Sequence, residues 1–451
     1  YYINYKYYNN LKDNINEDSD LKNWKYSTKK SNGIKCLIDE VKQVNVIKQG
    51  TFEFFYVEDY SNALDVITNC TREFYNNSYP IIVIENNNAG GEIDIGLLFK
   101  QLLQIKINQR TYFSVKISNI SKEEIEKDMN NKINIETCKP FNNFEEMKEV
   151  IDNYGDNITL HRTKVFQRFN SDILKQYEKL RKEFYSYKNL KRPTDIIIFT
   201  DSYSFGTTSF FIKGLQETGG AIVVGYKGNP TINVTFDASQ STSSFTKLDN
   251  TEIYNNLLVC GFNIFQITFY QSFDFSYQKE NPIPKEYTIF PVDERVNIYH
   301  KYNDSYYDEF IDAAINIFNK YNKDKMCNPN NLLLTLDPND EINCYIFEND
   351  THAHDGYQCG QNGTWSDVCI PYYCDIGYIF DTYNKKCIKD ICTEDGDEEE
   401  KEEEKEEEKE EEKENEKEKE KEKEKEKEKE REEEKEKEKE KEKEREEEKE
   451  K

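Results

Sequence analysis

Between residues 41 and 325, short apolar runs alternate with polar turns and with segments whose apolar residues recur at helical spacing. Three runs, residues 79–84 (YPIIVI), 194–200 (TDIIIFT) and 221–225 (AIVVG), are almost wholly apolar and are typical of buried strands. A helical pattern follows each of the first two runs, and a Gly-Gly pair ends the second helix. This alternation predicts an α/β body.

The two strand-to-helix connections carry the candidate chemistry of this body. The first, residues 85–91 (ENNNAGG), leads into a helix near Ile93, and the second, residues 201–208 (DSYSFGTT), leads into a helix that runs through Leu215. A turn of small residues at a helix N-terminus presents backbone N–H groups and short side chains, which stabilise an anion or a developing oxyanion. We therefore expect the functional site at these two turns.

Composition divides the chain into four regions. Residues 1–40 are polar and begin with Tyr rather than Met, so we expect them to be the end of a truncated N-terminal region. Residues 41–325 form the α/β body, residues 327–392 are rich in cysteine, and residues 393–451 are mostly Glu and Lys. Because a Glu/Lys repeat cannot bury apolar surface, the last region is predicted to be a disordered tail.

Charge and hydropathy exclude several classes of function. The formal net charge is −27, and the tail alone carries 36 acidic and 20 basic side chains. The body is mildly acidic and has no basic stripe, so nucleic acid is not an expected partner. No run of about 18 apolar residues occurs, so we expect no membrane span within this sequence. No cofactor-binding motif is found, and we predict no cofactor.

Eleven cysteines indicate an oxidising compartment. Seven of them lie close together and are predicted to form disulfides in a small module: Cys327, Cys344, Cys359, Cys369, Cys374, Cys387 and Cys392. His352 and His354 beside them raise zinc as an alternative, but no Cys-x2-Cys pair occurs and we predict no metal site. Eight sequons are candidate glycosylation sites of a secreted or cell-surface protein: Asn69, Asn76, Asn119, Asn157, Asn233, Asn303, Asn349 and Asn362.

Four segments of the body resemble the tail-specific, or C-terminal processing, serine peptidases. The segment IIVIENNNAGG is similar to that family's first strand-to-helix motif, and IIIFTDSYSFGTTSFFIKGLQETGGAIVVGY is similar to its nucleophile segment. VNVIKQGTFEF, from Val44, resembles the opening strand, and IPKEYTIFPVDERVNIY resembles the closing part of secreted eukaryotic members. The resemblance covers residues 36–325 and implies a ClpP/crotonase-like spiral of β-β-α units.

The resemblance also implies a serine nucleophile at position 206, where this chain has Gly206. Without a hydroxyl there, no neighbouring base can create a nucleophile. The family's lysine base would lie at Thr231, where the nearest lysine is Lys227, and the histidine that a second branch uses has no counterpart upstream of the first motif. Asp293 and Glu294 match the place of an acidic orienting residue, although a solvated surface pair is the simpler explanation of them.

The backbone part of the family's machinery is predicted to survive. Gly90, Gly91 and the amide of Thr207 would offer N–H groups to a peptide carbonyl, unless the two glycines only permit a tight turn. We therefore predict a nucleophile-deficient peptidase-family protein that binds a peptide or protein ligand rather than cleaving it. An active serine endopeptidase with a relocated hydroxyl, at Ser204 or Thr207, is the first alternative.

The cysteine-rich module supplies a second alternative. Residues 356–369 (GYQCGQNGTWSDVC) resemble the last part of a sushi repeat, in which Cys, Asn-Gly-x-Trp and Cys recur. Small disulfide-stabilised modules of this kind contact glycans or proteins. On this hypothesis the chain is an extracellular adhesion or interaction protein that binds through the module, and the α/β body is a rigid carrier.

Overall fold

The computed structural model describes most residues between Trp24 and Asp390. The residues outside the description are 1–23, 29–32, 53–56, 87, 89, 106–111, 119–120, 123–124, 127–128, 155–157, 169–178, 230, 232–234, 240–245, 248–265, 268–269, 274–283, 285–287, 299–305, 330–334, 337–351, 376, 382–385 and 391–451. They include the predicted tail and several predicted site residues: Cys344, Cys392, Asn119, Asn157, Asn233, Asn303 and Asn349. The chain divides into two compact units, residues 1–390 and residues 391–451, and all elements below belong to the first.

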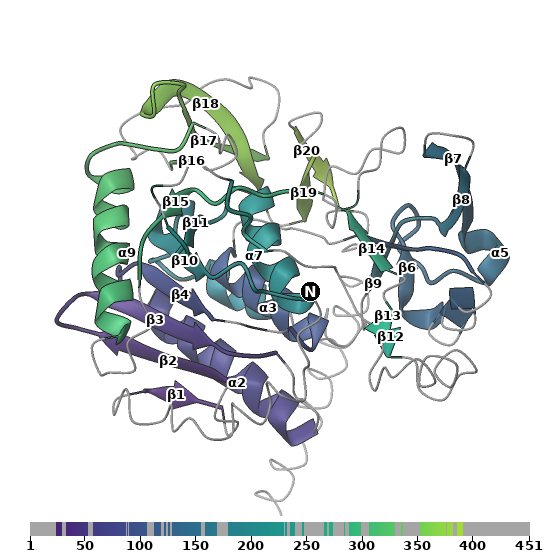
Figure 1. The fold of residues 1–451 in the computed structure, drawn as a ribbon, viewed down its shortest axis with the longest axis horizontal. Helices are drawn as coiled ribbons and strands as arrows, with labels where there is room; N and C mark the ends of the chain where they lie inside the picture. The colour runs from purple at the N-terminus through teal and green to yellow at the C-terminus, as the bar shows by residue number, and fades with distance from the viewer. Residues whose placement is uncertain are drawn as a thin grey trace, which may run out of the picture. The chain divides into compact units, whose positions relative to one another are not determined.

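A seven-stranded sheet lies at the centre of this unit (Figure 1). Its strands, in spatial order, are β1 (Tyr26–Ser27), β2 (Ile34–Asp39), β3 (Val44–Gln49), β4 (Ile81–Glu85), β10 (Ile196–Thr200), β11 (Ile222–Gly225) and β15 (Glu294–Arg295). From β3 to β15 neighbouring strands are parallel and are added in chain order, whereas β1 and β2 pair antiparallel. The three strands predicted from the apolar runs are therefore adjacent in one sheet.

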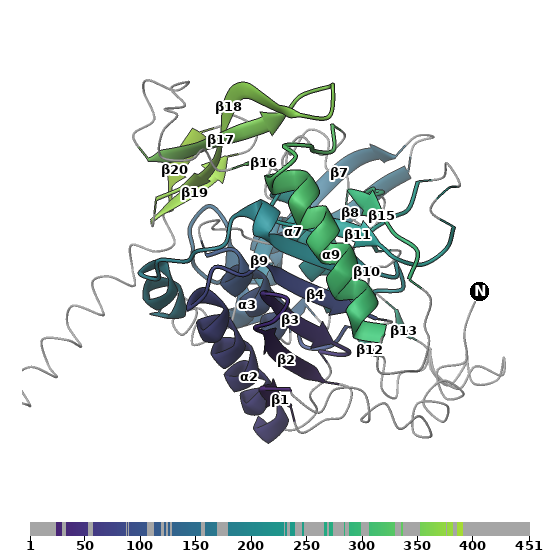
Figure 2. The same ribbon diagram turned by 90° about the vertical axis from the view of Figure 1, so that its left-hand side faces the viewer.

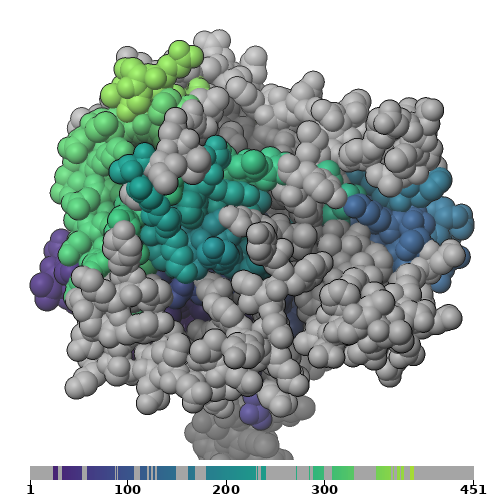
Figure 3. Space-filling model, in the orientation of Figure 1, coloured from purple at the N-terminus to yellow at the C-terminus, as the bar shows by residue number. Residues whose placement is uncertain are grey.

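Helices cover both faces of this sheet (Figure 2). Three helices, α2 (Val57–Tyr75), α3 (Ile93–Leu103) and α7 (Thr207–Glu217), connect successive strands and share one apolar core with one face. The fourth helix, α9 (Tyr306–Asn322), packs on the opposite face, and its residues form the green surface at one side of Figure 3. Strands β4 and β10 are buried at every position because both of their faces are covered. The mixed α/β class predicted from the sequence is confirmed.

A second, four-stranded sheet comes from the segments inserted after α3 and after β11. Its order is β14 (Tyr270–Phe273), β5 (Tyr112–Val115), β9 (Phe166–Arg168) and β6 (Lys132–Asn134). Phe210 of α7 joins the core of this sheet, edge-to-face with Phe113 at 5.3 Å, and Ile93 of α3 packs against it. The second sheet thus contacts the first turns of both helices.

Shorter elements complete the unit: η2 (Met129–Asn131), α5 (Phe144–Met147), β7 (Lys148–Tyr154), β8 (Ile158–Thr163), η3 (Pro193–Asp195), β12 (Thr246–Lys247) and β13 (Gln266–Ile267).

Disulfides occur in the body as well as in the cysteine-rich module. Cys36 of β2 is bonded to Cys70 of α2 inside the main core, and Cys138 is also disulfide-bonded. The sequence analysis predicted neither, because isolated cysteines far apart in a sequence carry no pairing signal. A disulfide within a buried core strengthens the inference of an oxidising compartment.

The cysteine-rich module consists of short antiparallel strands. One sheet contains β16 (Thr335–Leu336), β17 (Ala353–Cys359) and β18 (Trp365–Cys374), and a hairpin contains β19 (Tyr378–Asp381) and β20 (Lys386–Lys389). The predicted disulfide framework is confirmed for five cysteines: Cys327 is bonded to Cys359, Cys374 to Cys387, and Cys369 is also disulfide-bonded.

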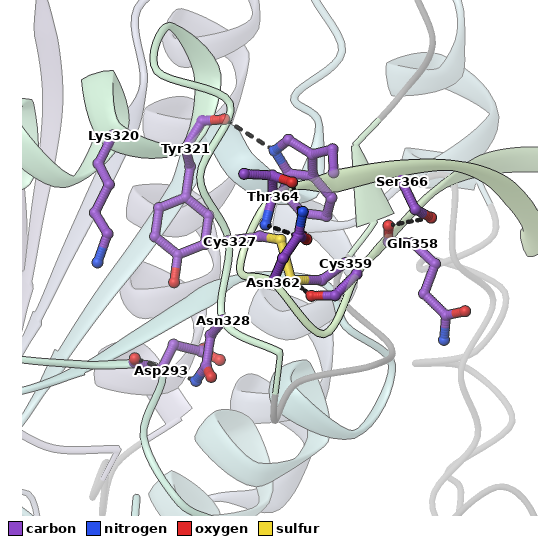
Figure 4. Close-up of a disulfide and its surroundings, with 12 residues drawn as sticks. Asp293, Lys320, Tyr321, Cys327, Asn328, Gln358, Cys359, Asn362, Thr364 and Ser366 are labelled. Carbon is purple, nitrogen blue, oxygen red and sulfur yellow. Dashed lines mark hydrogen bonds between the residues drawn. A yellow bond between two sulfur atoms is a disulfide. The ribbon is translucent and has the colours of Figure 1, made fainter.

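The module is attached to the body at the end of α9 (Figure 4). The Cys327–Cys359 disulfide joins the segment after α9 to β17, and both cysteines belong to the apolar core that α9 forms with the sheet. The indole N–H of Trp365 donates a hydrogen bond of 3.0 Å to the Tyr321 carbonyl. The Trp of the sushi-like segment is therefore engaged by α9.

Candidate functional site

The two strand-to-helix turns lie at the same edge of the sheet. Because β4 and β10 pair in parallel, with Ile81 opposite Ile196, their carboxyl ends are neighbours. The backbone N–H of Phe205 donates a hydrogen bond of 3.0 Å to the Asn88 carbonyl, which joins the second turn to the first. The two turns, at which the functional site is expected, therefore lie against each other.

Gly206 occupies the last position of the second turn and is the N-cap of α7. Its backbone angles, φ 51° and ψ −121°, lie in a region that L side chains rarely adopt and that glycine adopts without strain. At the predicted nucleophile position, this backbone therefore suits glycine. The turn supplies a helix N-terminus at that point and no hydroxyl.

The glycines of the first turn are engaged by the protein itself. The N–H of Gly90 donates a hydrogen bond of 3.0 Å to the side-chain oxygen of Asn88, so the predicted role of Gly90 as a donor to a ligand carbonyl needs this bond to break. Gly90 also lies against the second turn: a Cβ on it would stand 2.5 Å from the Phe205 carbonyl oxygen and 2.9 Å from the Thr207 nitrogen. The two turns are in van der Waals contact here, and Gly91 is exposed beside them.

The two hydroxyls proposed as substitute nucleophiles are held in different ways. Thr207 donates its Oγ1 hydrogen to the Gly91 carbonyl over 2.6 Å, which fixes the hydroxyl between the turns. Ser204 is only 1% exposed, and the hydroxyl of Ser239 binds its carbonyl at 2.8 Å. Neither hydroxyl is hydrogen-bonded to a histidine, lysine or carboxylate among the described residues, so neither is placed beside a base.

A buried polar network that the sequence analysis missed supports both turns. Glu85, the last residue of β4, accepts a hydrogen bond of 2.9 Å from the amide of Asn88, which in turn holds Gly90. Burial raises the pKa of Glu85 well above its ordinary value; the hydrogen bond from Asn88 opposes this, and the charge of Asp201 adds to it. Burial therefore favours the protonated, uncharged form of Glu85. An acidic residue directly after an unbroken apolar strand was the signal for it.

Asp201 directly follows β10 and is paired with a cation. Its fully buried carboxylate accepts a 2.9 Å ion-pair contact from the ammonium of Lys227, which lies just beyond β11. Lys227 also lies over the Tyr203 ring at 5.6 Å. Thr231, at the place that the resemblance gives to the lysine base, instead donates to the side chain of Asn229.

Of the predicted acidic orienting residues, Glu294 lies on β15 and Asp293 directly precedes this strand, on the far side of β11 from β10. Asp293 is buried, and its carboxylate accepts a 2.8 Å hydrogen bond from the Val223 N–H. Glu294 binds the ammonium of Lys320 at 2.6 Å and the hydroxyl of Tyr321 at 2.9 Å. The interpretation of Asp293 as part of a solvated surface pair is therefore wrong, because its carboxylate anchors one strand to the next. Both carboxylates bind groups other than those of the two turns.

Aromatic side chains are exposed at the second turn. Tyr203 is 49% exposed and Phe205 is 37% exposed, and both flank the buried Ser204. Alternation along the turn explains this, because the backbone of Phe205 is bonded inward to Asn88 while its ring lies outward. The turn therefore places two exposed rings and the Lys227 ammonium beside the N-terminus of α7.

The remaining predicted sites lie in the module and on α2. His352 and His354 both bind the carboxylate of Asp375, at 3.2 and 2.7 Å. Across the described ranges, no group of three or more His, Cys, Asp or Glu side chains is arranged to hold a metal ion. The sequon Asn362 is exposed on the β17–β18 turn. Asn76, the residue after α2, is exposed, whereas the half-buried Asn69 on α2 accepts a hydrogen bond from Arg72.

Comparison with known proteins gives weak likenesses to peptidases. No family model and no curated protein matches the chain. Among solved structures, a Parabacteroides merdae protein assigned as a peptidase has 13% identity and a TM-score of 0.31, with 67% of this chain and 68% of that chain covered. Mature CPAF has 12% identity and a TM-score of 0.34, over 67% of this chain and 57% of its own.

A Bacteroides fragilis protein assigned as an S41 protease has 11% identity and a TM-score of 0.33, over 63% of this chain and 57% of its own. At these values the function has to be argued from the residues of the chain itself. In the part of the chain that the structure describes, no helix combines the length and apolar character that a membrane crossing requires.

Proposed function

We propose that this chain is a secreted, nucleophile-deficient member of the tail-specific serine peptidase family, which binds a peptide at the Gly206 turn and does not cleave it. The observation that carries the proposal is Gly206 itself, placed at the N-terminus of α7 where the resemblance puts the catalytic serine. Its φ of 51° suits glycine, so the backbone of the turn disfavours a serine at this position.

The strand order supports the family's fold. Strands β3, β4, β10, β11 and β15 follow one another in the sheet in the order of the chain, and the connecting helices α2, α3 and α7 share one face. A sheet built by steady addition in one direction is what a spiral of β-β-α units requires. This ClpP/crotonase-like interpretation belongs to the proposal.

The chemistry of the site argues against hydrolysis. Peptide cleavage by this family needs an activated hydroxyl, and the hydroxyl and its base act as one unit. Position 206 offers no oxygen, and the Thr207 hydroxyl is committed to the Gly91 carbonyl. The only ammonium seen at the turn, among the described residues, is that of Lys227, and it is paired with Asp201.

The exposed surface of the turn argues for binding. Tyr203 and Phe205 present two aromatic rings whose backbone is fixed from below, so little conformational freedom is lost when a ligand packs on them. Gly91 is exposed in the first turn, which packs against the second turn that carries the rings, and its N–H group suits a main-chain carbonyl or carboxylate. A peptide with apolar side chains fits this combination.

Covalent labelling and binding test the two halves of the proposal separately. A serine-directed fluorophosphonate should not label the wild-type chain, because no activated hydroxyl is present at position 206. A peptide library should still yield binders, and the double variant Tyr203→Ala/Phe205→Ala should weaken their binding at least tenfold, the effect of losing about 1.4 kcal/mol of contact energy.

Ile289 provides a matched control, because it is exposed and apolar but belongs to another segment of the chain. Ile289→Ala should leave peptide binding unchanged. Stoichiometric labelling at Ser204 or Thr207 would instead establish the active-endopeptidase alternative. Peptide or glycan binding that survives the double variant but is lost when the cysteine-rich module is reduced would establish the module as the binding region.

A further inference from the structure

Three buried polar side chains, those of Gln49, Glu85 and Thr208, belong to elements that form the main core near the carboxyl edge of the sheet. Gln49 and Glu85 are register partners on these strands. Ile47 and Val83, two residues earlier, belong to the core shared with α3 and α7, so strand alternation places Gln49 and Glu85 on that same face.

Thr208 lies on the side of α7 that packs against this face of the sheet. On α7 the residues that enter the same core are Phe211, Ile212 and Leu215, which lie three, four and seven positions after Thr208. Residues at this spacing share one face of a helix, so Thr208 is the first member of the sheet-facing stripe. It lies in the first turn of α7, two residues after Gly206 at the carboxyl edge of the sheet.

Four polar atoms of these residues are buried without a hydrogen-bond partner. They are both amide atoms of Gln49, the Oε1 atom of Glu85 and the Oγ1 atom of Thr208. All three residues are 0% exposed. A single buried polar group without a hydrogen-bond partner can reflect a local misfit. Several such groups on one face of a well-packed core indicate a shared hydrogen-bonding partner, because each unpaired group opposes folding.

The chemistry of the cluster defines that partner. Burial raises the pKa of Glu85 and so favours its protonated form, which offers one O–H donor together with acceptor capacity. The Gln49 amide and the Thr208 hydroxyl each offer a donor and an acceptor as well. A set of neutral groups that both donate and accept matches water, which forms about three hydrogen bonds when buried.

We propose that Gln49, Glu85 and Thr208 form an internal hydration site, in which one or more ordered water molecules bridge β3, β4 and the first turn of α7. Glu85 connects the site to the functional turns, because its other carboxyl oxygen holds Asn88 and Asn88 holds Gly90. The water thus couples the sheet to the backbone around Gly206. The proposal is independent of whether the turn binds a peptide.

Thr208→Val separates this proposal from its opposite, because valine has the shape of threonine without the hydroxyl. If the hydroxyl is bonded to a buried water, its removal leaves the water short of a partner, and the midpoint of urea unfolding should fall. If the hydroxyl is truly unpaired, its removal should raise the midpoint, and the proposal is overturned. Thr208→Ser keeps the hydroxyl, so its midpoint of urea unfolding should fall less than that of Thr208→Val.

Thr71→Val is the matched control. Thr71 is also a buried helical threonine, but its hydroxyl donates to the Ile67 carbonyl within its own helix at 2.8 Å. Its midpoint therefore reports the cost of the same substitution where no water is involved. A Thr208→Val midpoint that falls no further than the Thr71→Val midpoint counts against the hydration site.

A double-mutant cycle and a crystal structure complete the test. Thr208→Val and Gln49→Met should be less than additive in their effect on the midpoint, because either substitution already disrupts the shared water. Strict additivity would show that the two residues have no common partner. In a high-resolution crystal structure of the wild type, water density should lie within hydrogen-bonding distance of Glu85 Oε1, and its absence would reject the site.

Discussion

The Gly206 turn and the cysteine-rich module are held together by different means. The turn relies on main-chain hydrogen bonds, on glycine backbone angles and on the chain from Glu85 through Asn88 to Gly90. The module relies on the Cys327–Cys359 and Cys374–Cys387 disulfides and on two histidines around one carboxylate. A binding surface built in the first way tolerates few substitutions beneath it, whereas one built in the second depends on covalent bonds.

The largest effect is expected from the module's attachment to the body. Replacing Cys327 and Cys359 by Ser should lower the free energy of unfolding of the module by about 2–5 kcal/mol, because the disulfide closes a loop between residues 32 positions apart. Trp365 reports this directly, since its indole binds the end of α9. Its fluorescence should change at lower urea than in the wild type.

The other tryptophan serves as the internal reference. Trp24 packs edge-to-face on Tyr307 of α9 at 5.7 Å and reports on the body. Loss of the Cys374–Cys387 pair, which lies wholly within the module, should leave the Trp24 transition in place. If removal of Cys327–Cys359 shifts the Trp24 transition as far as that of Trp365, body and module unfold as one unit and the contrast between them is incorrect.

A pair of glycines compares backbone crowding in the two regions. Gly90 in the turn and Gly377 in the module both have φ of 87°, but a Cβ on Gly90 would meet backbone at 2.5 Å, whereas a Cβ on Gly377 would meet nothing within 4 Å. Gly377→Ala should therefore cost only the strain of its backbone angle, about 1–2 kcal/mol. Gly90→Ala should cost roughly 1–3 kcal/mol more, because Phe205 must move. Equal midpoints of urea unfolding for the two variants would show that the turn with Gly90 is not packed against the turn with Phe205.

Gly206→Ser tests the turn's function and its strain together. A serine at φ 51° and ψ −121° should lower the free energy of unfolding by about 1–3 kcal/mol, and Gly206→Ala should cost the same. Fluorophosphonate labelling should be weak in the serine variant and absent in the alanine variant, because no base is bonded to that position. Rapid labelling of Gly206→Ser would show that a general base is already in place.

The positions of the two turns could be predicted from the sequence, but the side-chain hydrogen bonds that stabilise them could not. The three apolar strands, β4, β10 and β11, and the helices that follow the first two of them were predicted from apolar runs and spacing, since these patterns reflect burial on both faces of a sheet. The roles of Asn88 and Glu85 were not predicted, because they depend on the burial of Glu85, which results from the packing of other segments against it. The inward carboxylate of Asp293 escaped prediction for the same reason.

The disulfides divide in the same way. The close spacing of the cysteines between residues 327 and 392 predicted a disulfide framework in the module. The Cys36–Cys70 bond instead joins residues 34 positions apart inside the main core, and it was not predicted. Its cysteines lie on β2 and α2, and only the packing of that helix on the sheet brings them together. Long-range pairing is a tertiary property and has no local signal.

The smallest expected effect is on the pH dependence of stability, and it has opposite signs in the two regions. In the turn, burial raises the pKa of Glu85 above its ordinary value of 4.5. The folded chain therefore keeps this proton when the unfolded chain has lost it. The contribution of Glu85 to stability is full below about pH 4.5 and is lost as the pH rises through the folded pKa.

In the module the sign is reversed. Burial alone would raise the pKa of Asp375, but the hydrogen bonds from His354 and His352 outweigh it, and the pKa lies below the ordinary value of 3.8. The contribution of Asp375 is therefore present above about pH 3.8 and is lost as the pH falls through the folded pKa. Urea unfolding between pH 3 and pH 8 should show Glu85→Gln removing a loss of stability at high pH, and Asp375→Asn removing a loss at low pH. A like-signed change in both variants would mean that the two carboxyl groups are held alike, contrary to their contacts.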